Sequence, residues 1–247
     1  MSTSSRGRAR IGVLVPFTNT NLEPDLTMLR PEGVSISYTR LGGYEIDAVP
    51  DADQMAGMGE MPLDEPLRLL AGARPDVILY GCTSATLTLG SAFDKQLTGH
   101  IRDMTGATTV TAAGAIVHAL QSLDVNRIGF ASPYVAEIND RAISFLSDSG
   151  IETVSRADVD VALSSHGQGE MTPDEVFSLG KQADSSDAQA VVLSCTDMRG
   201  VETIKRLEET LGKPVVSSNQ AMLFAALQEL NINTGDIDCG RLFMHSV

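Results

Sequence analysis

The feature that most constrains the fold is an internal repeat. The segment IGVLVPF at residues 11–17 aligns with IGFASPY at 128–134, and VILYGCTS at 77–84 aligns with AVVLSCTD at 190–197. A third segment, TTVTAAGAIVHAL at 108–120, aligns with VVSSNQAMLFAAL at 215–227. The three offsets, 117, 113 and 107 residues, differ by amounts that insertions and deletions in loops produce. Because the matched segments follow the same order in both halves, we interpret the chain as a duplication of one folding unit.

Short apolar runs alternate with stretches of helical periodicity along most of the chain. After Gly114, for example, Ile116, Leu120 and Leu123 are spaced so that they share one helix face. Alternating strands and helices predict an α/β protein with parallel sheets, and continuous apolar strands indicate helices on both faces of a sheet. The predicted strands are 10–15, 34–40, 76–80, 108–112, 127–131, 151–158, 189–193 and 214–217. The predicted helices are one after Gly114 and those at 135–149, 173–183, 201–211 and 221–230.

Eight strands in a duplicated chain predict two pseudo-symmetric, Rossmann-like domains, each a four-stranded parallel sheet flanked by helices. We assign residues 1–112 and the C-terminal segment 218–247 to the first domain and residues 113–217 to the second. Ligands of open α/β sheets bind beyond the carboxyl ends of the strands. A pseudo-twofold axis would therefore bring Cys82 and Cys195, at matching strand ends, together across one cleft, which we predict to be the active site.

The two cysteines follow apolar runs at matching positions of the repeat. A thiol between a strand and a helix lies near the helix N-terminus, whose N–H groups and dipole favour the thiolate. A nucleophile or base needs the lowered pKa that such a position provides. Cys82 and Cys195 are thus the candidate catalytic residues, although either one alone could equally be a small buried apolar residue. Cys239 has no counterpart in the repeat and is interpreted as structural or incidental.

Neutral hydrogen-bond donors accumulate near the same strand ends. The loop VPFTNTNLEP at 15–24 can offer amide, hydroxyl and backbone N–H groups to a carboxylate before a helix opens. Residues that suit helix caps follow both cysteines, namely Thr83, Ser84, Thr196 and Asp197. His166 is a further candidate, either as a catalytic acid or base or as a residue that binds the substrate. Arg199 is expected to be solvated. The predicted substrate-binding residues are Asn19, Thr20, Thr83, Ser84, Tyr134, Thr196 and His166.

Composition narrows the function classes. The formal net charge is −14, which argues against nucleic acid or an anionic membrane surface as a partner, since both attract basic patches. No apolar stretch approaches the length of a membrane span, and the polar start of the chain lacks a signal-peptide pattern, so we expect a cytoplasmic protein. The three cysteines and four histidines show no metal-ligand spacing, so no metal site is expected. A site for an anion would use neutral donors and helix N-termini.

Several segments resemble the maleate cis–trans isomerases of the aspartate/glutamate racemase superfamily, which includes arylmalonate decarboxylase and hydantoin racemase. VPFTNTNLEPD resembles the VPxxNTxxEP signature, and ASPYVAEIND resembles the tyrosine segment. GCTSATLTLG and SCTDMRGVETIKRLEETLGKPVVSSNQAMLF resemble the two cysteine segments, so the match spans residues 10 to 230. Phe17 and Thr18 replace two serines of the signature, and residues 164–166, Ser-Ser-His, lie where the family has an asparagine.

The resemblance implies two pseudo-symmetric α/β domains, a cofactor-independent reaction on a small carboxylate and, commonly, a homo-oligomer. In an isomerase, the Cys82 thiolate adds to an alkene carbon of maleate, the adduct rotates about its new single bond, and fumarate is eliminated. Cys195 is then the acid, base or polarising partner, and Asn19 and Tyr134 carry over as substrate binders. Three alternatives stay open: a racemase with two opposed thiol bases, a decarboxylase, against which both retained cysteines argue, and a non-catalytic metabolite-binding protein.

Overall fold

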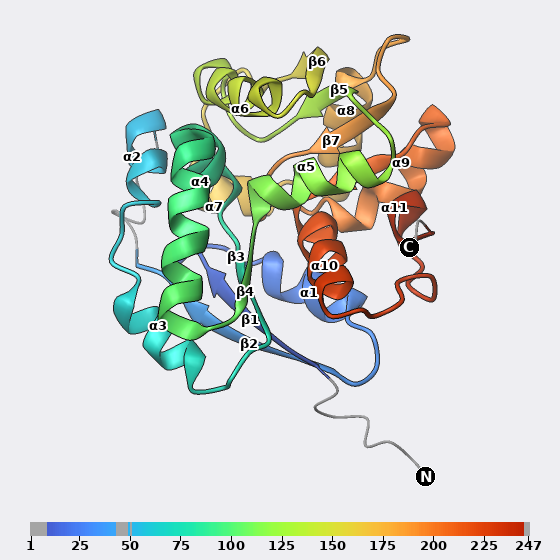
Figure 1. The fold of residues 1–247 in the computed structure, drawn as a ribbon. Coiled ribbons are helices and arrows are strands. Elements are labelled where there is room, and N and C mark those ends of the chain that lie inside the picture. The colour runs from blue at the N-terminus through green and yellow to red at the C-terminus, as the bar shows by residue number, and fades with distance from the viewer. Residues whose placement is uncertain (1–8, 43–48, 50, 245–247) are drawn as a thin grey trace.

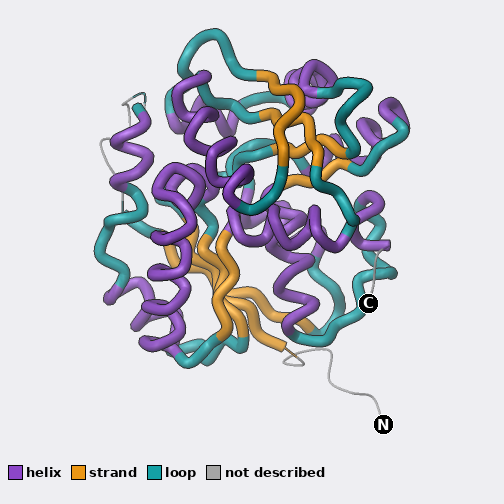
Figure 2. Tube along the Cα trace, turned by 45° about the horizontal axis from the view of Figure 1, so that its top comes forward, coloured by secondary structure: helices purple, strands orange, loops and turns teal. Residues whose placement is uncertain are grey.

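A computed structural model describes residues 9–42, 49 and 51–244. Over these residues the chain forms two four-stranded parallel sheets, which are seen separately in Figure 2. The first sheet has the strand order β2–β1–β3–β4 and the second has β6–β5–β7–β8. The second half therefore repeats the topology of the first, which confirms the predicted duplication and two-domain α/β fold. The strands are β1 (Ala9–Val15), β2 (Val34–Arg40), β3 (Val77–Tyr80), β4 (Thr108–Thr111), β5 (Arg127–Ala131), β6 (Glu152–Ala157), β7 (Ala190–Leu193) and β8 (Val215–Ser217).

Helices alternate with the strands and cover the sheets (Figure 1). The helices that follow β4 and β8 contact both halves: α5 contacts β4 and β8, and α10 contacts β3, β4 and β8. These two helices also pack against each other at the boundary between the halves. Within the described part of the chain, no helix is both long and apolar enough to cross a membrane. The helices are α1 (Leu22–Leu29), α2 (Ala52–Gly57), α3 (Asp64–Ala71), α4 (Thr83–Thr105), α5 (Ala112–Ser122), α6 (Ala136–Asp148), α7 (Ser165–Glu170), α8 (Pro173–Ala183), α9 (Ile204–Leu211), α10 (Ser218–Glu229) and α11 (Gly240–Met244).

Both faces of the first sheet are buried, as its continuous apolar strands predict. In β3, Val77 and Leu79 belong to one hydrophobic cluster, and Ile78 and Tyr80 belong to another. Alternate side chains of a strand point to opposite faces, so a strand that is covered on both sides is apolar at every position. The cluster that contains Val77 continues into the second half of the molecule. The two halves therefore share one core and form a tight interface.

Most element boundaries agree with the prediction, and the differences have local causes. The helix expected at 201–211 begins as a 3-10 turn, Val201–Thr203, before α9. Helix α10 starts three residues earlier than expected because the Ser217 side chain accepts a hydrogen bond from the Gln220 N–H and caps it. Helices α2, α3, α7 and α11 were not predicted. Residues 1–8, 43–48, 50 and 245–247 of the predicted first domain lie outside the described residues.

Candidate active site

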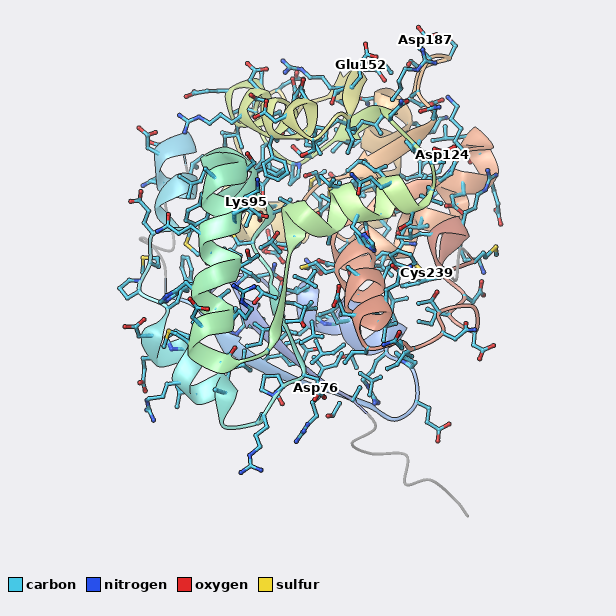
Figure 3. The ribbon with its side chains drawn as sticks, in the orientation of Figure 1. Asp76, Lys95, Asp124, Glu152, Asp187 and Cys239 are labelled. Atoms are coloured by element: carbon cyan, nitrogen blue, oxygen red, sulfur yellow. The ribbon has the colours of Figure 1, made fainter. Side chains whose placement is uncertain are left out.

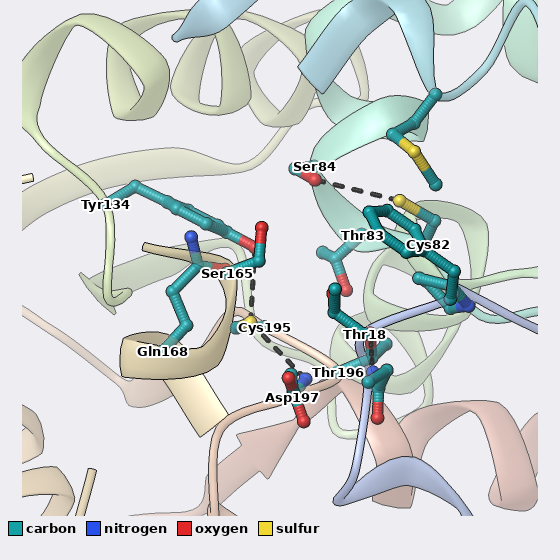
Figure 4. A pocket seen from close by; sticks show the side chains of 14 residues that line it. Thr18, Cys82, Thr83, Ser84, Tyr134, Ser165, Gln168, Cys195, Thr196 and Asp197 are labelled. Carbon is teal, nitrogen blue, oxygen red and sulfur yellow. Dashed lines mark hydrogen bonds between the residues drawn. The ribbon is translucent and has the colours of Figure 1, made fainter. Parts of the chain in front are cut away.

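A pocket lies between the two halves, beyond the carboxyl ends of β1, β3, β5 and β7. Figure 4 shows that side chains from both halves converge there around the two cysteines. The pocket offers about 40 Å³ to water-sized groups, whereas a single water needs about 10–15 Å³ by this measure. It therefore suits a small metabolite and not a nucleotide. The lining residues are Pro16, Phe17, Thr18, Asn19, Met58, Cys82, Thr83, Ser84, Tyr134, Ser165, Gln168, Cys195, Thr196 and Asp197.

Cys82 is placed in the pocket by a sharp turn after β3. A side chain at Gly81 would lie 2.3 Å from Leu22 and 2.9 Å from the carbonyl oxygen of Leu14, so the turn requires glycine. Cys82 itself has an extended backbone and immediately precedes α4, so the predicted helix N-terminus is present. The sulfur lies 3.7 Å from Ser84 Oγ. Strand, glycine and helix together direct this thiol into the pocket.

Burial decides the protonation of Cys82. The residue is 5% exposed, and burial raises the pKa of its thiol although the Ala85 N–H and the Ser84 hydroxyl act in the opposite direction. The lowered pKa predicted from the sequence is therefore wrong, because the cost of removing a thiolate from water outweighs these two hydrogen bonds, one of which comes from an N–H in the first turn of α4. Cys82 is a thiol at neutral pH and must lose its proton in order to act as a nucleophile.

Cys195 has a different environment from its counterpart. It is followed by a turn and not by the predicted helix, so it lacks the helix N-terminus that directly follows Cys82. Tyr134 Oη lies 3.1 Å from Cys195 Sγ, and the Asp197 N–H donates to the sulfur at 3.4 Å. Burial raises the pKa of Cys195 to about 12, with the Tyr134 hydrogen bond acting against it. A thiol with this pKa keeps its proton at neutral pH, as a proton donor requires.

Asn19 and Thr196 join the two halves beside the pocket. Asn19 Nδ2 donates to Thr196 Oγ1 at 3.0 Å, and Thr196 Oγ1 donates to the Gly81 carbonyl at 2.9 Å. Asn19 Oδ1 accepts hydrogen bonds from the backbone N–H groups of the second and third residues after it. These contacts hold the segment that carries Cys82 against the segment that carries Cys195.

The other predicted substrate-binding residues fall into two groups. Thr83, Ser84 and Tyr134 line the pocket, whereas Thr20 and His166 are outside its lining. Thr83 and Ser84 lie within α4 and do not cap it, and Thr83 Oγ1 donates to a serine hydroxyl of α10 at 3.1 Å. The Thr20 backbone N–H donates to a carboxylate of the second half at 2.8 Å, and His166 is exposed on α7.

The sequence did not predict the side chains that α7 and the end of α2 add to the pocket. Ser165 and Gln168 on α7 are 4% and 6% exposed and line it, as does Met58 after α2. Ser164 accepts a hydrogen bond from the Gly167 N–H and caps α7. This capping pattern was the available signal, since a serine followed by a short polar run predicts a helix start. A helix there would have placed Ser165 and Gln168 on one face.

Two residues singled out in the sequence lie outside the pocket. Cys239 lies beside α11 (Figure 3), and its carbonyl accepts a hydrogen bond from Gln220 Nε2 at 2.6 Å, in keeping with a structural role. Arg199 pairs with Glu202 and is solvated, as expected.

Across residues 9–42, 49 and 51–244, no three His, Cys, Asp or Glu side chains are grouped so that they could hold a metal ion.

The fold and the site define a class of protein: two matching α/β domains that each present a cysteine to a shared pocket. Within that class, the chain belongs to the arylmalonate decarboxylase family, whose model matches residues 11–243. The resemblance stated from the sequence is thereby confirmed at the level of the family.

Curated relatives and solved structures extend over nearly the whole chain. A maleate isomerase of Geobacillus stearothermophilus is 26% identical over 247 residues, covering 94% of this chain and 96% of the relative. An arylmalonate decarboxylase of Bordetella bronchiseptica is 28% identical and covers 87% and 85%. The structure of a Nocardia farcinica maleate cis–trans isomerase variant with a covalently bound succinylcysteine intermediate superposes with a TM-score of 0.87 at 22% identity, covering 97% of this chain and 99% of that chain. The likeness in structure confirms the fold.

Proposed function

We propose that this protein is an isomerase of a small cis-dicarboxylate that converts maleate to fumarate through a cysteine adduct. The observation that carries the proposal is that Cys82 and Cys195 line one pocket and that the Tyr134 hydroxyl is hydrogen-bonded to the Cys195 thiol. Further support comes from full-length relatives that are maleate isomerases and from a neighbouring structure with a succinylcysteine.

The two cysteines have different roles in the proposed reaction. Cys82 Sγ loses its proton to solvent and bonds to one alkene carbon, while the π electrons move to the other carbon and its carboxylate. The Cys195 thiol gives its proton to that second carbon, which produces a succinyl adduct. After rotation about the new single bond, the Cys195 thiolate removes a proton from the same carbon and the C–S bond breaks, releasing fumarate. The high pKa of Cys195 supports its role as the acid.

Neutral donors are the proposed ligands of the substrate carboxylates. Ser84 and Thr83 start α4 beside Cys82, Tyr134 lies beside Cys195, and Ser165 and Gln168 face the same space from α7. Hydroxyl and amide groups can donate to a carboxylate without carrying charge. Asn19 and Thr196 contribute through the contacts that hold the two cysteine segments together.

A second candidate function is racemisation of a carbon acid. The matching positions of Cys82 and Cys195 favour it, because two thiols on opposite sides of a carbon can each handle the proton on one face. Decarboxylation of a substituted malonate is a third possibility raised by the family. A two-base racemase must exchange the Cα proton with solvent, whereas addition and elimination at an alkene need not.

Proton NMR of the protein with maleate in D₂O separates these functions. We expect fumarate to appear with the wild-type protein and not with Cys82→Ser. Cys239→Ser is the matched control, because this buried cysteine lies outside the pocket lining, and it should remain active. If maleate stays unchanged while the Cα proton signal of an amino acid or hydantoin disappears, the isomerase is refuted and the racemase is favoured.

The proposal extends to the setting of the enzyme. All three cysteines are free and buried, which suits the reducing cytoplasm that we propose as its location. We propose residues 1–112 with 218–247 as the first domain and residues 113–217 as the second. Contacts of α10 with α1, β3 and β4 support the part of this assignment that concerns residues 218–229. α11 packs against α9 and β8 of the second half. The proposed homo-oligomer rests on the superfamily and is tested by sedimentation velocity.

A further inference from the structure

The ionisable side chains that line the pocket can only add negative charge. They are Cys82, Tyr134, Cys195 and Asp197, and no lysine, arginine or histidine is among the described lining residues. The whole chain carries a formal charge of −14. A dicarboxylate would therefore bring two more negative charges into a space where the described lining offers no compensating cation.

Two arginines close to pocket-forming segments are engaged elsewhere. Arg40 donates to backbone carbonyl oxygens of the loop 16–19 and pairs with Glu23 at 2.8 Å. Arg199 pairs with Glu202 at 2.7 Å, and the side chains of that pair are 38% and 37% exposed. Exposed, paired charges are screened by water and salt. Neither arginine neutralises a dianion inside the pocket.

Asp197 is the carboxyl group within this lining. It is 6% exposed, and its Oδ1 accepts hydrogen bonds from the Thr20 N–H at 2.8 Å and the Asn21 N–H at 3.1 Å. Its own N–H donates to Cys195 Sγ at 3.4 Å, so it connects the loop of the first half to the second cysteine. Burial raises the pKa of Asp197 to about 6, although the hydrogen bonds from Thr20 and Asn21 lower it. The group is thus close to titration at neutral pH.

Among the residues that the structure describes, the groups packed around Asp197 supply no unpaired cation. Asp25 of α1 is buried nearby, and the charge of Asp197 raises the pKa of Asp25 further. Helix α7 approaches through Gly169, where a side chain would lie within 3.0 Å of the carboxyl group, and its His166 and Glu170 are exposed. The loop 20–21 contributes neutral donors. The segment 195–202, to which Asp197 itself belongs, contributes Cys195 and the Arg199–Glu202 ion pair.

We propose that binding of a dicarboxylate is coupled to the uptake of one proton, and that Asp197 is the group that receives it. This inference rests on the proposed dicarboxylate substrate. Two carboxylates beside Asp197 in a water-poor pocket disfavour its charged form, because like charges repel strongly where the dielectric constant is low. The protonated protein therefore binds the ligand more tightly than the ionised protein does.

The sign of the pH dependence follows from this preference. Below about pH 6, Asp197 already carries its proton, so ligand affinity does not depend on the titration of this group. Above that pH the dissociation constant rises by up to about tenfold per pH unit, because the proton must be taken from solvent. A ligand with one negative charge fewer shows a weaker dependence.

Titration calorimetry of the wild-type protein tests the coupling directly. Fumarate is titrated near pH 7.5, where both of its carboxyl groups are ionised, in two buffers of different ionisation enthalpy. We expect uptake of close to one proton per bound fumarate and markedly less with its half-amide. No uptake, equal uptake with both ligands, or failure of both fumarate and maleate to bind would overturn the inference.

Two variants then test which group receives the proton. Asp197→Asn keeps a hydrogen-bond acceptor and should lose the uptake, whereas Asp25→Asn, the matched control at the neighbouring buried carboxyl, should retain it. The reverse pattern would overturn the assignment, and circular dichroism confirms that each variant is folded. Proton uptake without conversion of maleate would refute the isomerase and leave this inference standing. Conversion of maleate without proton uptake would support the isomerase and overturn this inference.

Discussion

The Thr196 hydroxyl offers a sharp test of how the two halves hold the pocket together. It accepts from Asn19 Nδ2 at 3.0 Å and donates to the Gly81 carbonyl at 2.9 Å, and the residue is 4% exposed. Valine has nearly the same shape but can neither donate nor accept. Thr196→Val therefore leaves the buried Asn19 amide and the buried Gly81 carbonyl without this hydrogen-bond partner. Each unsatisfied group costs roughly 1–3 kcal/mol of stability. We expect the free energy of unfolding to fall by about 2–6 kcal/mol.

Urea unfolding followed by circular dichroism measures this loss. Thr203→Val is the matched control, because Thr203 is 1% exposed but donates only to the carbonyl of Gly200, three residues away in the same half, at 2.8 Å. The control should lose about 1 kcal/mol. Folded Thr196→Val should also turn over maleate at least about tenfold more slowly, because the turn before Cys82 is no longer held in position. An equal loss of stability in both variants would refute the reasoning.

Three further predictions concern single side chains. Because burial raises the pKa of Cys82, its alkylation by iodoacetamide near pH 7.5 should be slower than that of free cysteine and should accelerate with pH; faster labelling would contradict the buried thiol. Burial raises the pKa of Asp25 to about 7, so the folded protein prefers the protonated form and should lose up to about 4 kcal/mol of stability as the pH rises from about 4 to 7; Asp25→Asn should lack this part of the pH dependence in urea titrations. Gly129→Ala places a Cβ 2.1 Å from a backbone carbonyl of α8 and should cost about 3 kcal/mol or more, whereas Gly99→Ala, with nothing within 4 Å, should be neutral or stabilising in a thermal melt.

The fold was predictable to the extent that it depends on short, continuous apolar runs. Strand β3 is an example: its four residues are apolar because helices cover both faces, and its end at Gly81 is marked by the glycine itself. That Cys82 and Cys195 face one pocket was predictable for a different reason. The repeat aligns them, and parallel strands present their carboxyl ends at the same edge of a sheet.

The missing parts depend on contacts between distant segments. Nothing in the local sequence around Ser165 or Gln168 indicates that α7 faces the cysteines, because its position is set by how the second half packs on the first. The pKa of Cys82 was predicted in the wrong direction for the same reason. Local sequence indicates a helix N-terminus, but the burial that dominates the pKa comes from residues elsewhere in the chain.

The central claim is that Cys82 bonds to the substrate while Cys195 moves the proton. Intact-mass spectrometry of Cys195→Ser after prolonged incubation with maleate tests it most directly. Without Cys195 the second carbon must take its proton from solvent, and the adduct, once formed, has no thiolate base to break it down. We predict a mass increase of one maleate, located at Cys82 by peptide mapping and absent from Cys82→Ser. Unmodified protein whose Cys82 still reacts with iodoacetamide, or an adduct on another residue, would contradict the account.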